Sequence, residues 1–168
     1  MSFIQTGGWR RALEPRGGDH ASKEVRGTPL SDRDDLPTDQ TDDEWRRTLT
    51  AEQYRVLRQH GTERPGSSPL TGEHRDGVFR CAGCGEPLFS SETKYDSCSG
   101  WPSFFAPLDG ALGASADNSL FMTRTEVHCR RCGGHLGHVF PDGPRPTGQR
   151  FCINGVALVF EPEKPEDG

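Results

Sequence analysis

The sequence predicts a mainly β domain that is preceded by short helices. Short apolar runs separated by turn residues follow one another from residue 78 to residue 160, which is typical of antiparallel strands. Helix signals occur near residues 41–61, and no long amphipathic pattern follows residue 62. Two Cys-x-x-Cys pairs within the strand region indicate a metal site, which would support a small core.

Composition limits the protein to one domain and few classes of partner. The chain has 168 residues, and eight of its nine Phe lie between residues 79 and 160, so we expect one aromatic core there. The net charge of −5 gives no support for nucleic-acid binding. No apolar run approaches the roughly 18 residues of a membrane span, and the first residues lack the apolar core of a secretory signal. We therefore expect a cytoplasmic protein without membrane or nucleic-acid contacts.

Residues 1–41 form an expected mobile tail. They hold Gly pairs, scattered Pro and an acidic cluster, without a hydrophobic period. The predicted domain spans residues 42–162, and residues 163–168 form a C-terminal tail.

Two short helices are predicted at the start of the domain. Trp45 and Leu49 are four residues apart, which places them on one side of a helix. The segment from Thr50 to Gln53 fits a capping box, and Gly61 is a natural helix end. We expect these helices to pack against the strands.

Each predicted strand is a short run with β-branched or aromatic residues, bounded by turn residues. They cover residues 78–80, 87–89, 120–127, 149–154 and 156–160. The last two are separated at Asn154-Gly155, a possible tight hairpin turn.

Four cysteines form the expected metal site. A two-residue spacer lets both thiolates of a pair face one ion, and two pairs complete the closed tetrahedral shell of structural zinc. The alternatives are a redox motif or buried free thiols. His135 and His138 follow the second pair, but four thiolates already fill the shell, so we expect neither to be a ligand. The predicted ligands are Cys81, Cys84, Cys129 and Cys132.

Cys152 stands apart from the two pairs and is a candidate nucleophile. Strand alternation places Arg150, Cys152 and Asn154 on one face, where a guanidinium and an amide can favour a thiolate. His135 and His138 could transfer protons near neutral pH. A small core cysteine is an equally common alternative.

Three further segments offer candidate site residues. Asp142 lies in a predicted turn, where it could orient a histidine or a water. Cys98 lies in a Ser/Gly loop, a reasonable place for a resolving thiol. Trp101 and Phe104 belong to a rigid aromatic run and are the expected substrate-binding residues, although aromatic residues are ordinarily core.

The order of these motifs resembles the B-type peptide-methionine (R)-S-oxide reductases. The resemblance runs from about Asp43 to Glu161. The run Gly-Trp-Pro-Ser-Phe and the segment His135 to Gly143 are highly specific to that family, and Arg-Phe-Cys-Ile-Asn follows them.

The resemblance implies two antiparallel sheets with one structural zinc ion. It also implies reduction of the R epimer of methionine sulfoxide, through a sulfenic acid and a disulfide that thioredoxin reduces. Cys152 falls on the catalytic cysteine, Trp101 on the aromatic that receives the substrate methyl group, and the four paired cysteines on the zinc ligands. The polar pocket positions correspond to His135, His138, Asp142, Arg150 and Asn154.

One position departs from the family pattern. The resolving cysteine of the family usually precedes the Gly-Trp-Pro-Ser-Phe run directly, where this chain has Ser99, and Cys98 comes one residue earlier. We expect Cys98 to be the resolving thiol; the alternative is a one-cysteine enzyme regenerated by an external thiol.

We also expect a monomer. The rival function is a zinc-stapled β module that binds a peptide or nucleic acid without catalysis.

Overall fold

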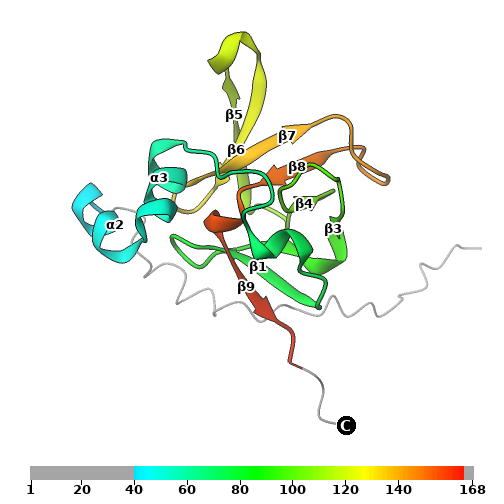
Figure 1. Cartoon of the computed structure of the whole chain (residues 1–168), viewed down its shortest axis with the longest axis horizontal. Helices are drawn as coiled ribbons and strands as arrows, with labels where there is room; N and C mark the ends of the chain where they lie inside the picture. The colour runs from blue at the N-terminus through cyan, green and yellow to red at the C-terminus, as the bar shows by residue number, and fades with distance from the viewer. Residues whose placement is uncertain (1–39, 165–168) are drawn as a thin grey trace, which may run out of the picture.

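The computed structural model describes residues 40–164, which form two antiparallel sheets with two short helices at one side (Figure 1). The predicted fold class is confirmed. Most of the two expected tails, residues 1–39 and 165–168, lies outside the described residues. Within residues 40–164, every helix is too short or too polar to cross a membrane.

Both helices begin where local signals predict. They are α2 (Asp42–Thr48) and α3 (Ala51–Gln59). The Thr50 hydroxyl accepts the Gln53 N–H, and the Gln53 side chain accepts the Thr50 N–H, which completes a capping box. Helix α3 ends at His60, whose φ of 55° is left-handed, so the end falls one residue before the expected Gly61. Trp45 is buried and anchors α2.

The strands divide into a sheet of three and a sheet of six. The first has the order β2-β1-β9, with β1 (Gly77–Cys81), β2 (Pro87–Ser90) and β9 (Leu158–Pro162). The second has the order β3-β4-β8-β7-β6-β5, with β3 (Lys94–Tyr95), β4 (Ser103–Phe104), β5 (Leu112–Asp117), β6 (Arg124–Cys129), β7 (His135–Phe140) and β8 (Arg150–Ile153). Short 3₁₀ helices span Pro69–Gly72, Ser91–Thr93, Ser119–Phe121 and Gly155–Ala157.

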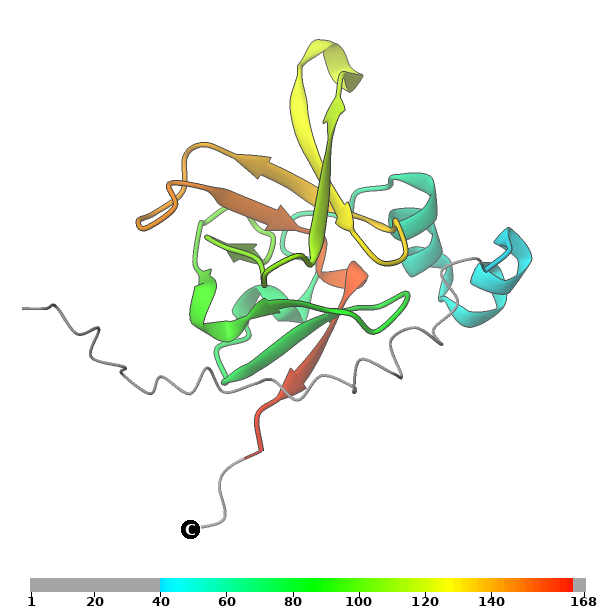
Figure 2. The same cartoon turned by 180° about the vertical axis from the view of Figure 1, so that it is seen from behind.

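An aromatic core joins the two sheets, as the distribution of Phe predicts. Phe104 of the six-stranded sheet stacks on Phe89 of the other sheet, with 4.1 Å between ring centroids. Phe79 meets Phe104 edge-on at 5.0 Å. Figure 2 shows the two sheets from behind, with the short β4 next to β8 in the larger sheet.

The expected strand over residues 120–127 is only partly right. Leu120 and Phe121 have φ of 57° and 60° and lie in the turn between β5 and β6, so β6 begins at Arg124. These two strands form the hairpin that projects from the body in Figure 1. Strand β5 escaped prediction because its sequence, LGASAD, has no β-branched or aromatic residue.

The expected hairpin at Asn154-Gly155 is wrong. Strands β8 and β9 belong to different sheets, and the Gly155–Ala157 turn carries the chain between them. The buried Glu63 carboxylate holds this turn, because it accepts the N–H of Gly155 at 2.6 Å and of Val156 at 3.0 Å. A Cβ at Gly155 would collide with the Ser68 side chain, so any larger residue there would force Ser68 to move.

Candidate active site

The two cysteine pairs converge on one point between the sheets. The Sγ atoms of Cys81 and Cys132 are 3.7 Å apart, and those of Cys84 and Cys129 are 3.6 Å apart. Sulfur atoms bound at 2.3 Å around a tetrahedral zinc ion are about 3.8 Å apart. The four cysteines therefore suit a metal ion in both chemistry and spacing, and they are the predicted ligands.

A glycine directly after each cysteine pair completes the turn that holds the pair. Gly85 donates its N–H to the carbonyl of Cys81, and Gly133 donates to that of Cys129. Both glycines have φ above 70°, a conformation that other residues adopt at a cost. Cys81 ends β1 and Cys129 ends β6, so an ion here would tie the two sheets together.

A row of polar residues crosses the six-stranded sheet through Cys152. His138 of β7 and Ser103 of β4 lie directly opposite Cys152 on its two sides. Glu126 of β6 lies opposite His138, and Ser115 of β5 opposite Glu126. Residues opposite each other on neighbouring strands share a face, so the row lies on one side of the sheet.

The other face of β8 belongs to the core. Phe151 and Ile153 are buried, whereas Arg150 and Cys152 are half-buried on the polar side. The predicted alternation is therefore confirmed within the strand, and Cys152 is not a core cysteine.

Ser99 is the loop residue that contacts the Cys152 thiol. Its Oγ lies 3.6 Å from Cys152 Sγ and 2.8 Å from Ser97 Oγ. Cys98 is exposed instead, with φ of 56° and its N–H donated to Asp96 Oδ1. The structure thus brings Ser99 to the thiol, and leaves Cys98 at the surface of the same loop.

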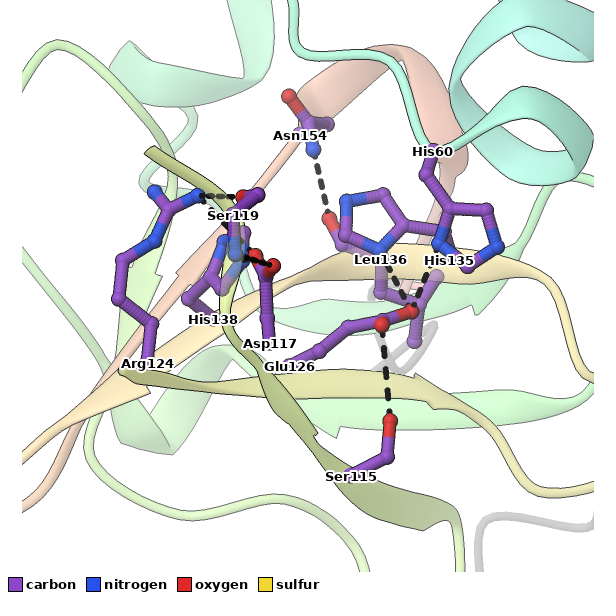
Figure 3. Close-up of polar contacts among 10 residues, drawn as sticks. All are labelled: His60, Ser115, Asp117, Ser119, Arg124, Glu126, His135, Leu136, His138 and Asn154. Carbon is purple, nitrogen blue, oxygen red and sulfur yellow. Dashed lines mark hydrogen bonds and ion pairs between the residues drawn. The ribbon is translucent and has the colours of Figure 1, made fainter. Parts of the chain in front are cut away.

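Carboxylates hold both histidines in place (Figure 3). His135 Nδ1 lies 2.9 Å from Glu126 Oε1, and His138 Nε2 lies 2.8 Å from Asp117 Oδ2. Burial lowers the pKa of His135, although the hydrogen bond to Glu126 opposes that shift. The N–H of Ser119 and the contact with His138 lower the pKa of Asp117. The Asp117 carboxylate is therefore ionised at neutral pH.

A polar cavity of about 240 Å³ adjoins these pairs. The Nε2 atom of His135 is buried and has no hydrogen-bond partner among the described residues. It is therefore available to a water or a ligand. The lining residues are His60, Thr62, Asp117, Ser119, Arg124, Glu126, His135 and His138.

Asp142 pairs with Arg150 rather than with a histidine. Arg150 donates from Nε and Nη2 to the two oxygens of Asp142, at 2.9 and 3.1 Å. This bidentate ion pair raises the pKa of Arg150 and lowers that of Asp142. The guanidinium also lies 4.4 Å from the centroid of the Phe140 ring. Its charge and orientation are thus fixed on the face that carries Cys152.

The remaining expected site residues are Trp101, Phe104 and Asn154, and they are half-buried or buried. The half-buried Trp101 donates its indole N–H to the carbonyl of Glu63 at 3.2 Å. Phe104 is fully buried, which contradicts its expected place against a substrate. Asn154 is also buried: its amide donates to the Leu136 carbonyl and accepts the Glu63 N–H, so it supports the turn after β8.

Several partners of the site had no place in the sequence prediction. Asp117 was missed because β5 was missed. Glu126 carries a weak signal, since it occupies a polar position in the alternation of Arg124 to Cys129. Glu63 acts through contacts distant in sequence, which no local pattern indicates. Position 99 was marked by the family pattern, but the contact of Ser99 with Cys152 was not predicted.

Known proteins resemble this chain over the same range. A family model described as the SelR domain matches residues 49–162. A protein of Agrobacterium fabrum named "Peptide methionine sulfoxide reductase MsrB" is 53% identical over 134 residues, covering 79% of this chain and 99% of the relative. Proteins of the same name from Leptospira interrogans and Leifsonia xyli subsp. xyli are 54% and 56% identical, covering 73% of this chain in each case and 95% and 90% of the relatives. This chain belongs to the SelR domain family.

Proposed function

We propose that this chain reduces the R epimer of methionine sulfoxide to methionine, with Cys152 as the nucleophile. The observation that carries the proposal is the polar row. In this row the half-buried Cys152 lies directly opposite His138. The chain is also 53% identical to the Agrobacterium fabrum protein named "Peptide methionine sulfoxide reductase MsrB". A zinc-stapled binding module accounts for the four paired cysteines, but not for a cysteine directly opposite a histidine that a carboxylate holds.

The chemistry transfers one oxygen atom from sulfur to sulfur. The Cys152 thiolate attacks the sulfoxide sulfur while a proton reaches the sulfoxide oxygen. The protonated oxygen then passes to the Cys152 sulfur. The sulfur–oxygen bond of the substrate and the transient bond between the two sulfurs break, methionine leaves, and Cys152 becomes a sulfenic acid. The substrate sulfur is reduced by two electrons, and the cysteine sulfur is oxidised by two.

Charges near Cys152 support each part of this step. Arg150, two residues along the same strand face, places a cation on the side of the sheet that carries Cys152. His135 offers an Nε2 without a partner among the described residues, and His138 lies opposite Cys152 on the neighbouring strand, so either is available for proton transfer. Trp101 is the proposed contact for the substrate methyl group, on the strength of the family motif.

Regeneration needs a second thiol. Cys98 would attack the sulfenic acid, releasing water and forming a disulfide that an external dithiol opens. Because Cys98 is exposed and Ser99 occupies the contact position, this step requires the loop to move. Thioredoxin as the reductant, a monomeric state and a cytoplasmic location are proposals drawn from the resemblance and composition.

We propose that the cysteine cluster holds one zinc ion. The residues that would bind it are Cys81, Cys84, Cys129 and Cys132. With four thiolates in its shell, the ion would have no open position, so its contribution is to stability.

A stereospecific assay tests the function. The protein is given the R and S epimers separately, with dithiothreitol as reductant, and methionine formation is measured. The proposal requires turnover of the R epimer only. Equal turnover of both epimers, or of neither, would reject it.

A further inference from the structure

A second group of side chains of the types that ligate metals lies apart from the cysteine cluster. His60 caps the end of α3, Glu126 lies on β6 and His135 begins β7. One ligand atom from each lies within 4.8 Å of the others. Figure 3 shows the two imidazoles on one side of the Glu126 carboxylate.

The donor atoms lie slightly closer to the shared carboxylate oxygen than the ligands of a first-row metal ion lie to one another. Nδ1 of His60 is 3.1 Å and Nδ1 of His135 is 2.9 Å from the same oxygen, Glu126 Oε1. Ligands bound at 2.0 to 2.1 Å around a tetrahedral zinc ion are about 3.3 Å apart. A small separation of the three side chains would therefore admit an ion between them.

The scaffold holds two of the three ligands firmly and leaves an entrance at the third. The side chains of Glu126 and His135 are 13% and 3% exposed, whereas that of His60 is 64% exposed. The polar cavity beside them leaves room for water in the remaining coordination position. The nearby cation, Arg124, is paired with Asp117 at 3.1 Å, so its charge is largely offset.

We propose that His60, Glu126 and His135 form a second metal site, which binds one divalent transition-metal ion of the zinc class. Two imidazoles and one carboxylate suit zinc, cobalt or nickel, whereas calcium and magnesium require oxygen ligands. When both Nδ1 atoms bind the ion, His135 carries its proton on Nε2, the atom that lacks a protein partner. The site goes beyond the proposed reductase activity.

The test uses the full chain with zinc already in its cysteine site, titrated with Co²⁺. Calorimetry counts the bound ions, and visible absorption separates nitrogen and oxygen ligands from thiolate ligands. We expect one further Co²⁺ per chain. Loss of a second-shell partner costs about 10- to 100-fold in metal affinity, so loss of a ligand should weaken binding by at least about 100-fold.

Two variants remove one ligand each. His60→Gly suits the left-handed backbone at residue 60, and Glu126→Gln preserves the size of the side chain. Both should lose the second ion. His74→Gly removes an exposed histidine outside the group and should keep it.

Either of two results would overturn the site: no further ion binds, or it binds equally well to His60→Gly and Glu126→Gln. The readout is binding alone. It therefore stands or falls separately from the methionine sulfoxide assay.

Discussion

Ser99 Oγ lies 3.6 Å from Cys152 Sγ, while Cys98, the adjacent residue, is exposed. The serine bonds with Ser97, which in turn lies 2.6 Å from Ser103 Oγ on the strand beside Cys152. Three hydroxyls thus fix the loop against the thiol. A disulfide requires Cα atoms within about 7 Å and converging Cβ vectors, and in this arrangement residue 99 is the better placed.

Replacing Cys98 separates the two modes of regeneration. Cys98→Ser should still release about one methionine per chain, because the first step needs only Cys152, but turnover with thioredoxin should slow. Adding Ser99→Cys to Cys98→Ser should restore thioredoxin-driven turnover, since the new thiol occupies the contact position. Unchanged thioredoxin turnover in Cys98→Ser would show that this cysteine is not the resolving thiol.

Loss of one cluster cysteine should remove the metal. Cys81→Ser breaks the shell at the end of β1, and we expect loss of about one zinc per chain together with a lower melting temperature. Metal analysis and thermal unfolding check both results. Cys98→Ser, outside the cluster, is the matched control. A Cys81→Ser protein that kept its zinc and its melting temperature would contradict the proposed site.

Glu63 should be the main support of the turn that follows β8. Glu63→Ala leaves the buried N–H of Gly155 and the half-buried N–H of Val156 without their acceptor, which should lower the free energy of unfolding by about 3 kcal/mol. Glu63→Gln keeps one acceptor and should cost about 1 kcal/mol. Urea unfolding measures both. Equal stability of the alanine variant and the wild type would refute this role.

Asp117 should make stability depend on acid pH. Its folded pKa lies below the ordinary value of 3.8, mainly because of the Ser119 N–H and His138. Its contribution is therefore complete above about pH 4 and is lost as pH falls toward the folded pKa. Asp117→Asn should be less stable at neutral pH and lose less stability on acidification. The exposed Asp109→Asn is the control, and identical pH slopes for wild type and Asp117→Asn would rule out the effect.

The sequence predicted correctly those features whose contacts join residues close together in the chain. The capping box at Thr50, the glycine-closed cysteine pairs and the alternation around Cys152 all depend on residues a few positions apart. The partners of the histidines depend on register instead. Glu126 meets His135, and Asp117 meets His138, only because β5, β6 and β7 are neighbours in one sheet.

Phe104 and Asn154 show the limit of motif reasoning. Both lie in motifs shared with the reductases, yet one stacks in the core and the other bonds to backbone. A motif identifies which residues matter, but not whether a side chain faces the substrate or the interior. That distinction is made by the packing of two sheets whose pairing no single segment encodes.

The central claim is that Cys152 takes the oxygen of the sulfoxide. The most direct measurement is methionine formed from the R epimer without any reductant. Wild type and Cys98→Ser should each form about one methionine per chain and then stop, and Cys152→Ser should form none. Methionine formation by Cys152→Ser at the wild-type level would contradict the account.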